Sequence, residues 1–302
     1  MKGITCLLFG LFVLFSPLLK AHSDCCAPKS DTIPFHITAH NNIVIEALLN
    51  EQDTVRLMFH TAASGITLIQ EATARLASIK WNHTDTVNSW GGQNEARYSA
   101  SNSLKMGNQA WTNLEIWENR NSGPGTDGKF GPELFENKAI EVDFDRKQLV
   151  IHSKLPNKAS KFKKLKLTFE DGFMFVSGTS YVNKKAYENR FLIHSGYGGT
   201  ILYDDEFVAK TEIGQAIEII EVQELKDSYG NVLLTKKGYL PKFKLGGFRF
   251  KNIPVGFFEG AIARQKMSVI GGDLIKRFNL IIDAERAFIY IQRNTLAKLG
   301  FG

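Results

Sequence analysis

Two histidines occupy matching places in the two halves of the sequence, and imidazole is the side chain whose charge changes most readily near neutral pH. His60 follows the mostly apolar run Val55–Phe59, and His194 follows the apolar run Phe191–Ile193. Each histidine is followed by a hydroxyl residue and then by a short stretch rich in small residues. An imidazole in such a turn can bind a metal or act as a general base.

The chemistry open to this pair depends on what accompanies it. Imidazole suits zinc or copper, but a stable site normally has at least three protein ligands, and the nearest other histidines have no spacing that brings them there. A general base needs a nucleophile and an orienting group, and only the hydroxyls of Thr61, Ser64 and Ser195 stand beside the pair. We therefore assign no catalytic residue and no metal ligand, and we expect no cofactor.

The elements that must position the two histidines are repeated along the chain. Phe130–Asp143 can be laid on Ile270–Asp283 without a gap, and each segment leads into a short alternating strand. Two copies of one structural unit explain this match. The expected organisation is a first lobe in residues 22–153, a linker in residues 154–164 and a second lobe in residues 165–302.

Short runs of Val, Ile, Phe and Thr that alternate with polar residues predict an all-β fold, because a half-buried strand buries every second side chain. The clearest strand segments are Phe35–Thr38, Val44–Leu49, Thr54–Phe59, Met174–Ser177, Phe191–His194 and Ile217–Val222. Helical pattern is limited to Gln70–Leu76, Pro132–Glu136, Asp204–Lys210 and Asp273–Arg277. Each half is expected to close into a β barrel with a few short helices.

The two histidine motifs and the two later glycine segments resemble the aspartic protease superfamily, in particular its retropepsin-like bacterial members. That family has an apolar strand, then Asp-Thr/Ser-Gly-Ala-Ser/Thr, then an apolar pair, and later a hydrophobic-Gly turn with a short helix. Here the first signature reads HTAASGIT from His60 and HSGYGGTI from His194, and the second signature begins at Gly131 and Gly271. The resemblance covers nearly the whole chain after residue 21, and it implies two homologous β-barrel lobes with a cleft between them.

The sequence departs from the family at the positions that carry its chemistry. Histidines 60 and 194 stand where the family has aspartates, and Ala62 stands where the first motif has glycine. The family mechanism uses two carboxylates that share one proton and hold a water between them. An imidazole offers one acceptor nitrogen at most, and none when it is protonated. Aspartic-type catalysis is therefore not expected, and His60 and His194 are interpreted as degenerate dyad positions.

The resemblance also implies a cleft that two hairpins cover. By position these are Ser89–Gln93, which carries Trp90, and Asp227–Asn231, which carries Tyr229. In the family the motif hydroxyls are hydrogen-bond partners that hold the active loops. The predicted binding residues are Thr61, Ser64, Ser195, Gly196, Trp90 and Tyr229.

Three functions remain open at this point. The first is a pseudoprotease that binds a peptide or protein in the cleft, since a cleft can add a peptide strand without any carboxylate. The second is a hydrolase, such as a peptidase, that uses the His60 and His194 pair with or without a bound metal. The third is a folded protein whose cleft binds nothing.

The first residues have the pattern of a secretory signal peptide. Lys2 precedes an apolar run from Ile4 to Leu19, and Ala21 is a small residue that suits cleavage. The alternative is a membrane anchor, but the run has 16 residues and a span needs about 20. We predict a signal peptide in residues 1–21 and a secreted or periplasmic protein. Lipid attachment at Cys25 or Cys26 is a second possibility, although no lipobox precedes them.

Composition limits the partners. The net charge of +6 is spread along the chain, apart from a denser stretch from Lys154 to Lys166 that is interpreted as a solvated connector. We expect no nucleic-acid partner, no membrane span after the signal peptide, and a monomer, because two fused lobes remove the need to dimerise. Beyond Cys26 the chain has no cysteine and hence no disulfide framework.

Overall fold

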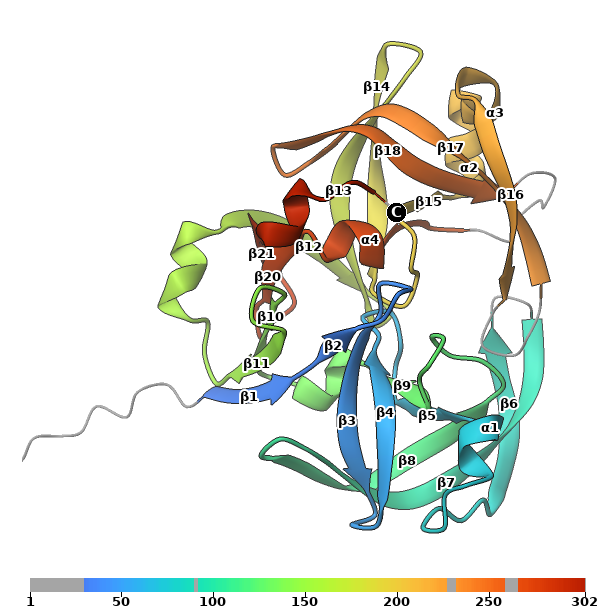
Figure 1. Cartoon of the computed structure of the whole chain (residues 1–302), viewed down its shortest axis with the longest axis vertical. Coiled ribbons are helices and arrows are strands. Elements are labelled where there is room, and N and C mark those ends of the chain that lie inside the picture. The colour runs from blue at the N-terminus through green and yellow to red at the C-terminus, as the bar shows by residue number, and fades with distance from the viewer. Residues whose placement is uncertain (1–29, 90–91, 227–231, 259–265, 302) are drawn as a thin grey trace, which may run out of the picture.

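The computed structural model describes residues 30–89, 92–226, 232–258 and 266–301. These residues form two lobes stacked along the long axis of the molecule, with the blue-to-green first lobe below the yellow-to-red second lobe (Figure 1). The predicted signal peptide (1–21), Cys25, Cys26, Trp90 and Tyr229 lie outside the described residues.

Strands dominate both lobes, as the alternating sequence pattern predicts. The first lobe contains β1 (Ser30–Pro34), β2 (His36–Ile37), β3 (Ile43–Leu49), β4 (Asp53–Phe59), β5 (Ile66–Ile69), α1 (Gln70–Thr73), β6 (His83–Ser89), β7 (Gly92–Met106), β8 (Gln109–Asn119), β9 (Gly128–Phe130), η1 (Pro132–Phe135), β10 (Ala139–Asp143) and β11 (Gln148–His152). After η2 (Asn157–Lys161), the second contains β12 (Lys163–Glu170), β13 (Phe173–Val182), β14 (Lys185–His194), β15 (Ile201–Tyr203), α2 (Asp205–Thr211), α3 (Ile213–Ala216), β16 (Ile219–Lys226), β17 (Val232–Leu245), β18 (Phe248–Phe258), β19 (Ser268–Gly271), α4 (Gly272–Ile275), β20 (Phe278–Ile282), β21 (Phe288–Arg293) and η3 (Thr295–Lys298).

The same strand arrangement places a histidine at the inner end of each lobe. In the first lobe β9 runs parallel to β4 and antiparallel to β5, so it fills the space between them. In the second lobe β19 runs parallel to β14 and antiparallel to β15. The ends of β4 and β14, where His60 and His194 lie, are therefore next to the turns at Gly131 and Gly271. This duplication confirms the expected pair of homologous β lobes.

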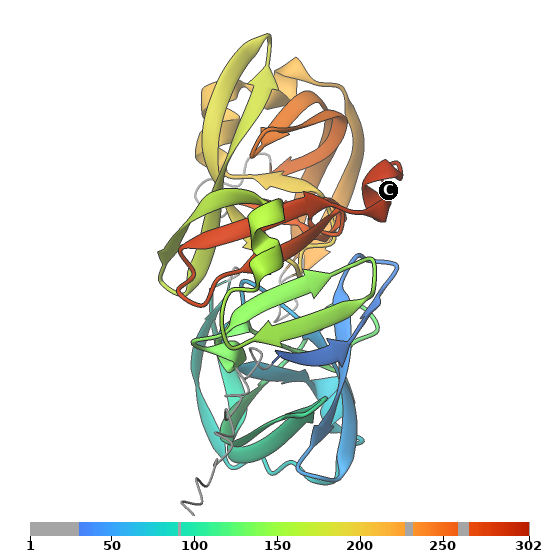
Figure 2. The ribbon, with the colours of Figure 1, turned by 90° about the vertical axis from the view of Figure 1, so that its left-hand side faces the viewer.

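A sheet shared by both lobes fixes their relative position. Its strand order is β1-β11-β10-β20-β21-β12, and the seam between the lobes is the antiparallel pairing of β10 with β20. All five residues of β10 are buried, including the acidic residues Glu141 and Asp143. Figure 2 shows the sheet from its outer side, with the red strands of the second lobe above the green strands of the first. The two histidine loops are held in one orientation by this seam.

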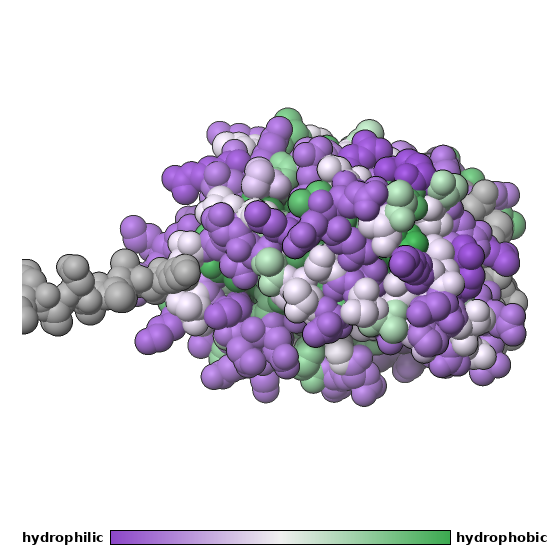
Figure 3. Space-filling view, turned by 90° about the horizontal axis from the view of Figure 1, so that it is seen from below, coloured by the Kyte–Doolittle hydropathy of each residue, from purple (hydrophilic) through white to green (hydrophobic). Residues whose placement is uncertain are grey.

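The end of the first lobe that faces away from the second lobe is mainly hydrophilic. Seen from below, the end of the lobe that faces away from its partner shows polar residues with scattered apolar ones (Figure 3). Within the described ranges, no helix has the length and apolar character needed to cross a membrane. In the predicted linker, residues 157–161 form η2 and β12 already begins at Lys163.

Candidate functional site

The two sequence motifs meet where the lobes touch. His60 directly follows β4 and His194 is the last residue of β14, and their ring centroids are 4.5 Å apart with planes inclined by 60°. His60 is buried, with 7% of its surface exposed, and His194 is half-buried. The structure thus brings together the two histidines that the resemblance places at matching positions of the two lobes.

Thr61 and Ser195 lock the two loops to each other. The Thr61 hydroxyl donates to the carbonyl of Ile193 at 2.6 Å and accepts the Ser195 backbone N–H at 3.0 Å. In return the Ser195 hydroxyl donates to the carbonyl of Phe59 at 2.7 Å and accepts the Thr61 backbone N–H at 2.9 Å. Both side chains are buried, so all four bonds exclude water. These hydroxyls hold the loops in the way the resemblance implies, while a ligand-binding role for either stays a prediction.

A turn of the first lobe supports the loop of the second. The side-chain amide of Asn42 donates to the carbonyls of Ser195 and Gly196 at 3.2 and 3.3 Å, and Asn42 is only 1% exposed. Asn41 donates to the carbonyl of Gly198 at 2.7 Å. Sequence reasoning missed both asparagines, and their only signal was an Asn-Asn turn between two apolar runs.

Two buried arginines support the glycine turns beneath the loops. Arg286 comes from the second lobe but donates to the carbonyls of Pro132 and Phe135 in η1. Arg277 is 2% exposed, forms an ion pair with Asp273 at 3.2 Å and donates to carbonyls near the C-terminus. Sequence reasoning missed these two arginines too, because arginine side chains are usually exposed.

The backbone decides which nitrogen of each imidazole carries hydrogen. The N–H of Ala62 donates to Nδ1 of His60 at 3.2 Å, and the N–H of Tyr197 donates to Nδ1 of His194 at 2.9 Å. A nitrogen that accepts a hydrogen bond has no hydrogen of its own, so in the neutral ring the hydrogen is on Nε2. Both Nε2 atoms are therefore donors.

Burial keeps both imidazoles neutral at physiological pH. It lowers the pKa of His194 to about 4, with a further lowering from the positive charge of Lys129. Burial, then the neighbouring His194 and then Lys129 hold the pKa of His60 well below its usual value. Because a charged ring loses its hydration here and faces other positive charge, protonation is disfavoured. The pair thus presents two neutral N–H donors near an ammonium group.

Gly196 is needed for the close approach of the rings. A Cβ added at this position would lie 2.2 Å from Cδ2 and 2.3 Å from Nε2 of His60. The glycine of the second motif therefore contacts the histidine of the first. The equivalent first-loop residue, Ala62, instead packs against the apolar cluster of the second lobe.

We expect Gly196→Ala to displace the His60 ring and to lower the free energy of unfolding by about 1–3 kcal/mol. Urea denaturation measures the loss, and imidazole NMR signals report the ring displacement. Ala62→Gly is the matched control, because it changes one methyl group in the opposite loop and should cost less than about 1 kcal/mol. If both substitutions lowered the free energy of unfolding equally, the close contact between Gly196 and the His60 ring would be contradicted.

The other predicted binding residues are Ser64 and Gly196, which lie on the two loops, and Trp90 and Tyr229. Ser64 is exposed on the first loop. Gly196 contacts His60 as stated above, and its predicted role towards a ligand stays a prediction. The same holds for Trp90 and Tyr229, which lie outside the described residues.

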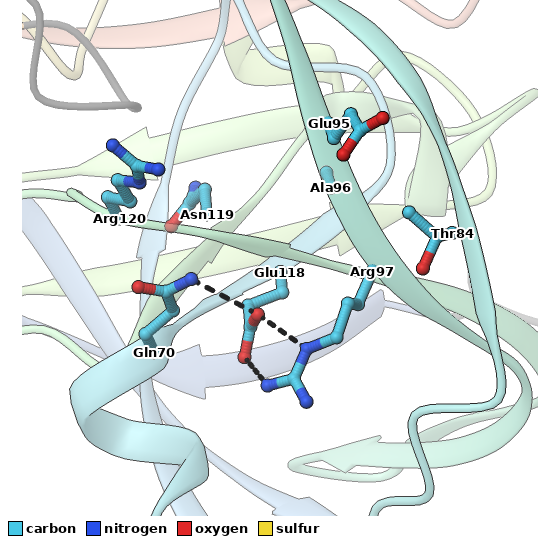
Figure 4. A pocket seen from close by; sticks show the side chains of 8 residues that line it. All are labelled: Gln70, Thr84, Glu95, Ala96, Arg97, Glu118, Asn119 and Arg120. Atoms are coloured by element: carbon cyan, nitrogen blue, oxygen red, sulfur yellow. Dashed lines mark hydrogen bonds and ion pairs between the residues drawn. The ribbon is translucent and has the colours of Figure 1, made fainter.

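A polar pocket of about 320 Å³ lies between the β6–β7 hairpin, the end of β8 and α1 (Figure 4). Its centre is the buried carboxylate of Glu118, which accepts two bonds from Arg97 at 2.9 and 2.6 Å and one from Gln70 at 3.3 Å. Burial alone would raise the pKa of Glu118, but the bonds and charge of Arg97, together with the bonds from Gln70 and Thr73, lower it. Sequence reasoning did not find this pocket, since its residues come from four separate segments.

Removing the Arg97 guanidinium should leave this buried carboxylate short of donors. We expect Arg97→Met to lower the free energy of unfolding by about 1–2 kcal/mol at pH 7. Arg120→Met is the control, because Arg120 is exposed and lines the same pocket. Thermal denaturation of both variants makes the comparison, and an equal loss would show that the Glu118 bonds contribute nothing.

The donor set of the histidine pair does not suit a metal ion. A metal at Nε2 requires the ring hydrogen on Nδ1, where it would face the backbone N–H groups of Ala62 and Tyr197. Within residues 30–89, 92–226, 232–258 and 266–301, no group of three or more His, Cys, Asp or Glu side chains is arranged to hold a metal.

Comparison with known proteins connects the fold, but not the sequence, to a known class. No protein-family model matches the chain, and no curated protein matches it. Among solved structures, an aspartic proteinase from Irpex lacteus matches with a TM-score of 0.60, covering 91% of this chain and 100% of that chain at 11% identity. The chain therefore has the two-lobed fold of the aspartic proteinases.

Proposed function

We propose that the protein is an aspartic-protease-like pseudoenzyme that binds a peptide or protein segment in the cleft between its lobes. His60 and His194 stand, in this proposal, at the positions of the catalytic aspartates. The observation that carries the proposal is that the Nδ1 atom of each histidine accepts a backbone N–H. Each ring is then left with one N–H donor, at Nε2, and no acceptor nitrogen.

Such a pair cannot replace two carboxylates. The aspartic mechanism needs a lone pair that takes a proton from water and an acid that gives one to the scissile carbonyl. With its hydrogen on Nε2, neither imidazole has a lone pair to offer. Moving the hydrogen to Nδ1 would set it against the N–H of Ala62 or Tyr197, which opposes the hydrolase alternative as well.

The contacts that hold the two loops and the two lobes together support the proposal. The bonds between Thr61 and Ser195 and the seam between β10 and β20 hold the two lobes in register. Peptides bind to such sheet-lined surfaces mainly through backbone hydrogen bonds and side-chain pockets, which require no carboxylate pair. A binding protein with this fold needs the contacts that hold its lobes together, but it does not need two catalytic carboxylates.

The test is retention of peptides without cleavage. A random peptide library is passed over the immobilised protein at pH 7, and mass spectrometry compares the lengths of retained and applied peptides. We expect a retained subset of unchanged length. Shortened peptides, or no retained subset, would overturn the proposal.

Export is part of the same proposal. The apolar segment Ile4–Leu19 followed by Ala21 supports a cleaved signal and a secreted or periplasmic protein. N-terminal sequencing of the protein made in its own cell should begin at His22. An intact Met1 on the isolated protein would contradict this part.

A further inference from the structure

We propose that a basic face on the second lobe binds an extended acidic segment of a partner protein. This basic face consists of Lys242 and Lys244 in β17 and of Arg249 and Lys251 in β18. In Figure 1 these strands lie in the upper lobe, where β17 pairs with β18 on one side and with β13 on the other. The basic face includes neither histidine, so its test is independent of the function proposed for the cleft.

Strand register sets like charges directly opposite each other on this face. Lys242 lies across from Lys251, and Lys244 lies across from Arg249. Phe243, between the two lysines, is buried, so the basic side chains are on the outward side of the sheet. Opposed side chains have Cβ atoms about 5 Å apart, and like charges at this distance destabilise a sheet. Two such pairs in succession oppose folding, and an anionic partner would offset the repulsion in both.

The fold supplies no carboxylate in contact with these charges. No Asp or Glu of the described residues forms an ion pair with any of the four side chains. The strands β13, β17 and β18 contain no acidic residue, and β14 contributes only Glu188. Glu188 lies opposite Thr179, which lies opposite Lys244, so two strand spacings of about 4.8 Å each separate the two charges. Arg293 adds positive charge, because its guanidinium donates to the Arg249 carbonyl at 3.0 Å.

The spacing of the charges fits an extended acidic chain. Lys242 and Lys244 are two residues apart in one strand, and Arg249 and Lys251 are two residues apart in the next. In any extended chain, side chains on the same face repeat at about 6.8 Å. A segment with Asp or Glu at alternate positions would therefore place one carboxylate over each opposed pair. The guanidinium of Arg249 can hold such a carboxylate by two parallel hydrogen bonds.

The same face is less suited to a nucleic acid or to a lipid surface. Tyr181, which lies opposite Lys242, has its ring covered by the Lys242 ammonium group at 3.9 Å and so is not open to stacking with a base. Among the described residues, none of the exposed large apolar side chains belongs to residues 177–190 or 241–251. A surface that enters a lipid layer carries such side chains.

Peptide binding tests the charge and the spacing separately. Fluorescence anisotropy with the purified protein compares a peptide of alternating Thr and Glu with its Gln form and with a peptide of the same composition whose Glu residues are adjacent. We expect the alternating acidic peptide to bind at least about tenfold more tightly than either, and to weaken as salt rises from about 50 mM to about 500 mM. Equal binding of the two acidic peptides, or tighter binding of single-stranded DNA or of phosphatidylglycerol vesicles, would overturn the proposal.

A charge reversal should separate binding from stability. Lys244→Glu should weaken peptide binding about tenfold and raise the urea midpoint of unfolding, because it turns the repulsive pair with Arg249 into an attractive one. Lys105→Glu is the matched control, since Lys105 is exposed in β7 and lies opposite Ala110, so the same change of charge should leave both quantities unchanged.

Lys251→Glu repeats the test at the other opposed pair, so a single variant that fails to fold does not decide the outcome. Equal losses of binding in the Lys244 and Lys105 variants would assign the binding to net charge and overturn the proposal. Urea midpoints that fall in both Lys244→Glu and Lys251→Glu would show that the opposed pairs do not repel, which would also overturn it.

Discussion

Thr61→Val is expected to lower the free energy of unfolding by about 2–5 kcal/mol, because two buried backbone groups lose their partner. These are the carbonyl of Ile193 and the N–H of Ser195, which lie at 2.6 and 3.0 Å from the threonine hydroxyl. Valine keeps the shape of the side chain and removes only the hydroxyl. Since the loops lie between the lobes, the loss should appear in unfolding of the whole protein, measured by urea denaturation.

Thr54→Val is the matched control for this prediction. Thr54 lies in β4, the strand that leads to His60, but its side chain is exposed, so we expect a change within about 0.5 kcal/mol. Ser195→Ala completes a double-mutant cycle with Thr61→Val. The two losses should not add, because each side chain also bonds the other's backbone. If Thr61→Val costs no more than Thr54→Val, the loops are held together by something else.

Acidification should destabilise the protein through the histidine pair. A depressed pKa in the folded state means that the unfolded chain binds protons more strongly, so stability falls as the pH falls below the unfolded value of about 6.5. For His194, whose folded pKa is about 4, the loss is about 2 kcal/mol between pH 7 and pH 5 and about 3 kcal/mol by pH 4. His60 adds a loss of the same sign.

Variants isolate this effect from the carboxylates. His194→Asn keeps an oxygen that can accept the Tyr197 N–H but does not titrate, so its urea midpoint should change less between pH 7 and pH 5. His36→Asn, at an exposed histidine of β2, should follow the wild-type protein. Carboxylates whose pKa the fold lowers, such as Glu118, lose their contribution only at lower pH. If the urea midpoint of His194→Asn fell with pH as steeply as that of the wild-type protein, protonation of the His194 ring would not destabilise the fold.

The sequence repeat, together with the resemblance of its motifs to the aspartic proteases, predicted the fold and the pairing of the two histidines. An alternating apolar pattern is a local feature of the sequence. The turns at Gly131 and Gly271 belong to β9 and β19, which pair with the strands that lead to the two histidines. The predicted helical segments also appear, although Gln70–Leu76 is regular only over Gln70–Thr73. Helix ends depend on contacts of the flanking residues, which a local pattern does not contain.

The details that decide the chemistry are non-local, and the sequence did not predict them. The tautomer of each histidine depends on a backbone N–H that only the folded turn aims at Nδ1. Asn42 and Arg286 act on segments of the opposite lobe, at distances set by the shared sheet. The spacing of residues within a motif carries no information on such contacts. Reasoning from residue types alone therefore left the general-base and metal alternatives open.

The measurement that tests the pseudoenzyme proposal most directly is cleavage of a peptide library by the purified protein from pH 3 to pH 8, with and without added zinc. The wild-type protein and the double variant His60→Ala/His194→Ala are run side by side. We predict no cleavage above the level of the double variant under any condition, because neither imidazole can offer a base to water. Cleavage by the wild-type protein that the double variant lacks would contradict the proposal and make the two histidines a catalytic pair.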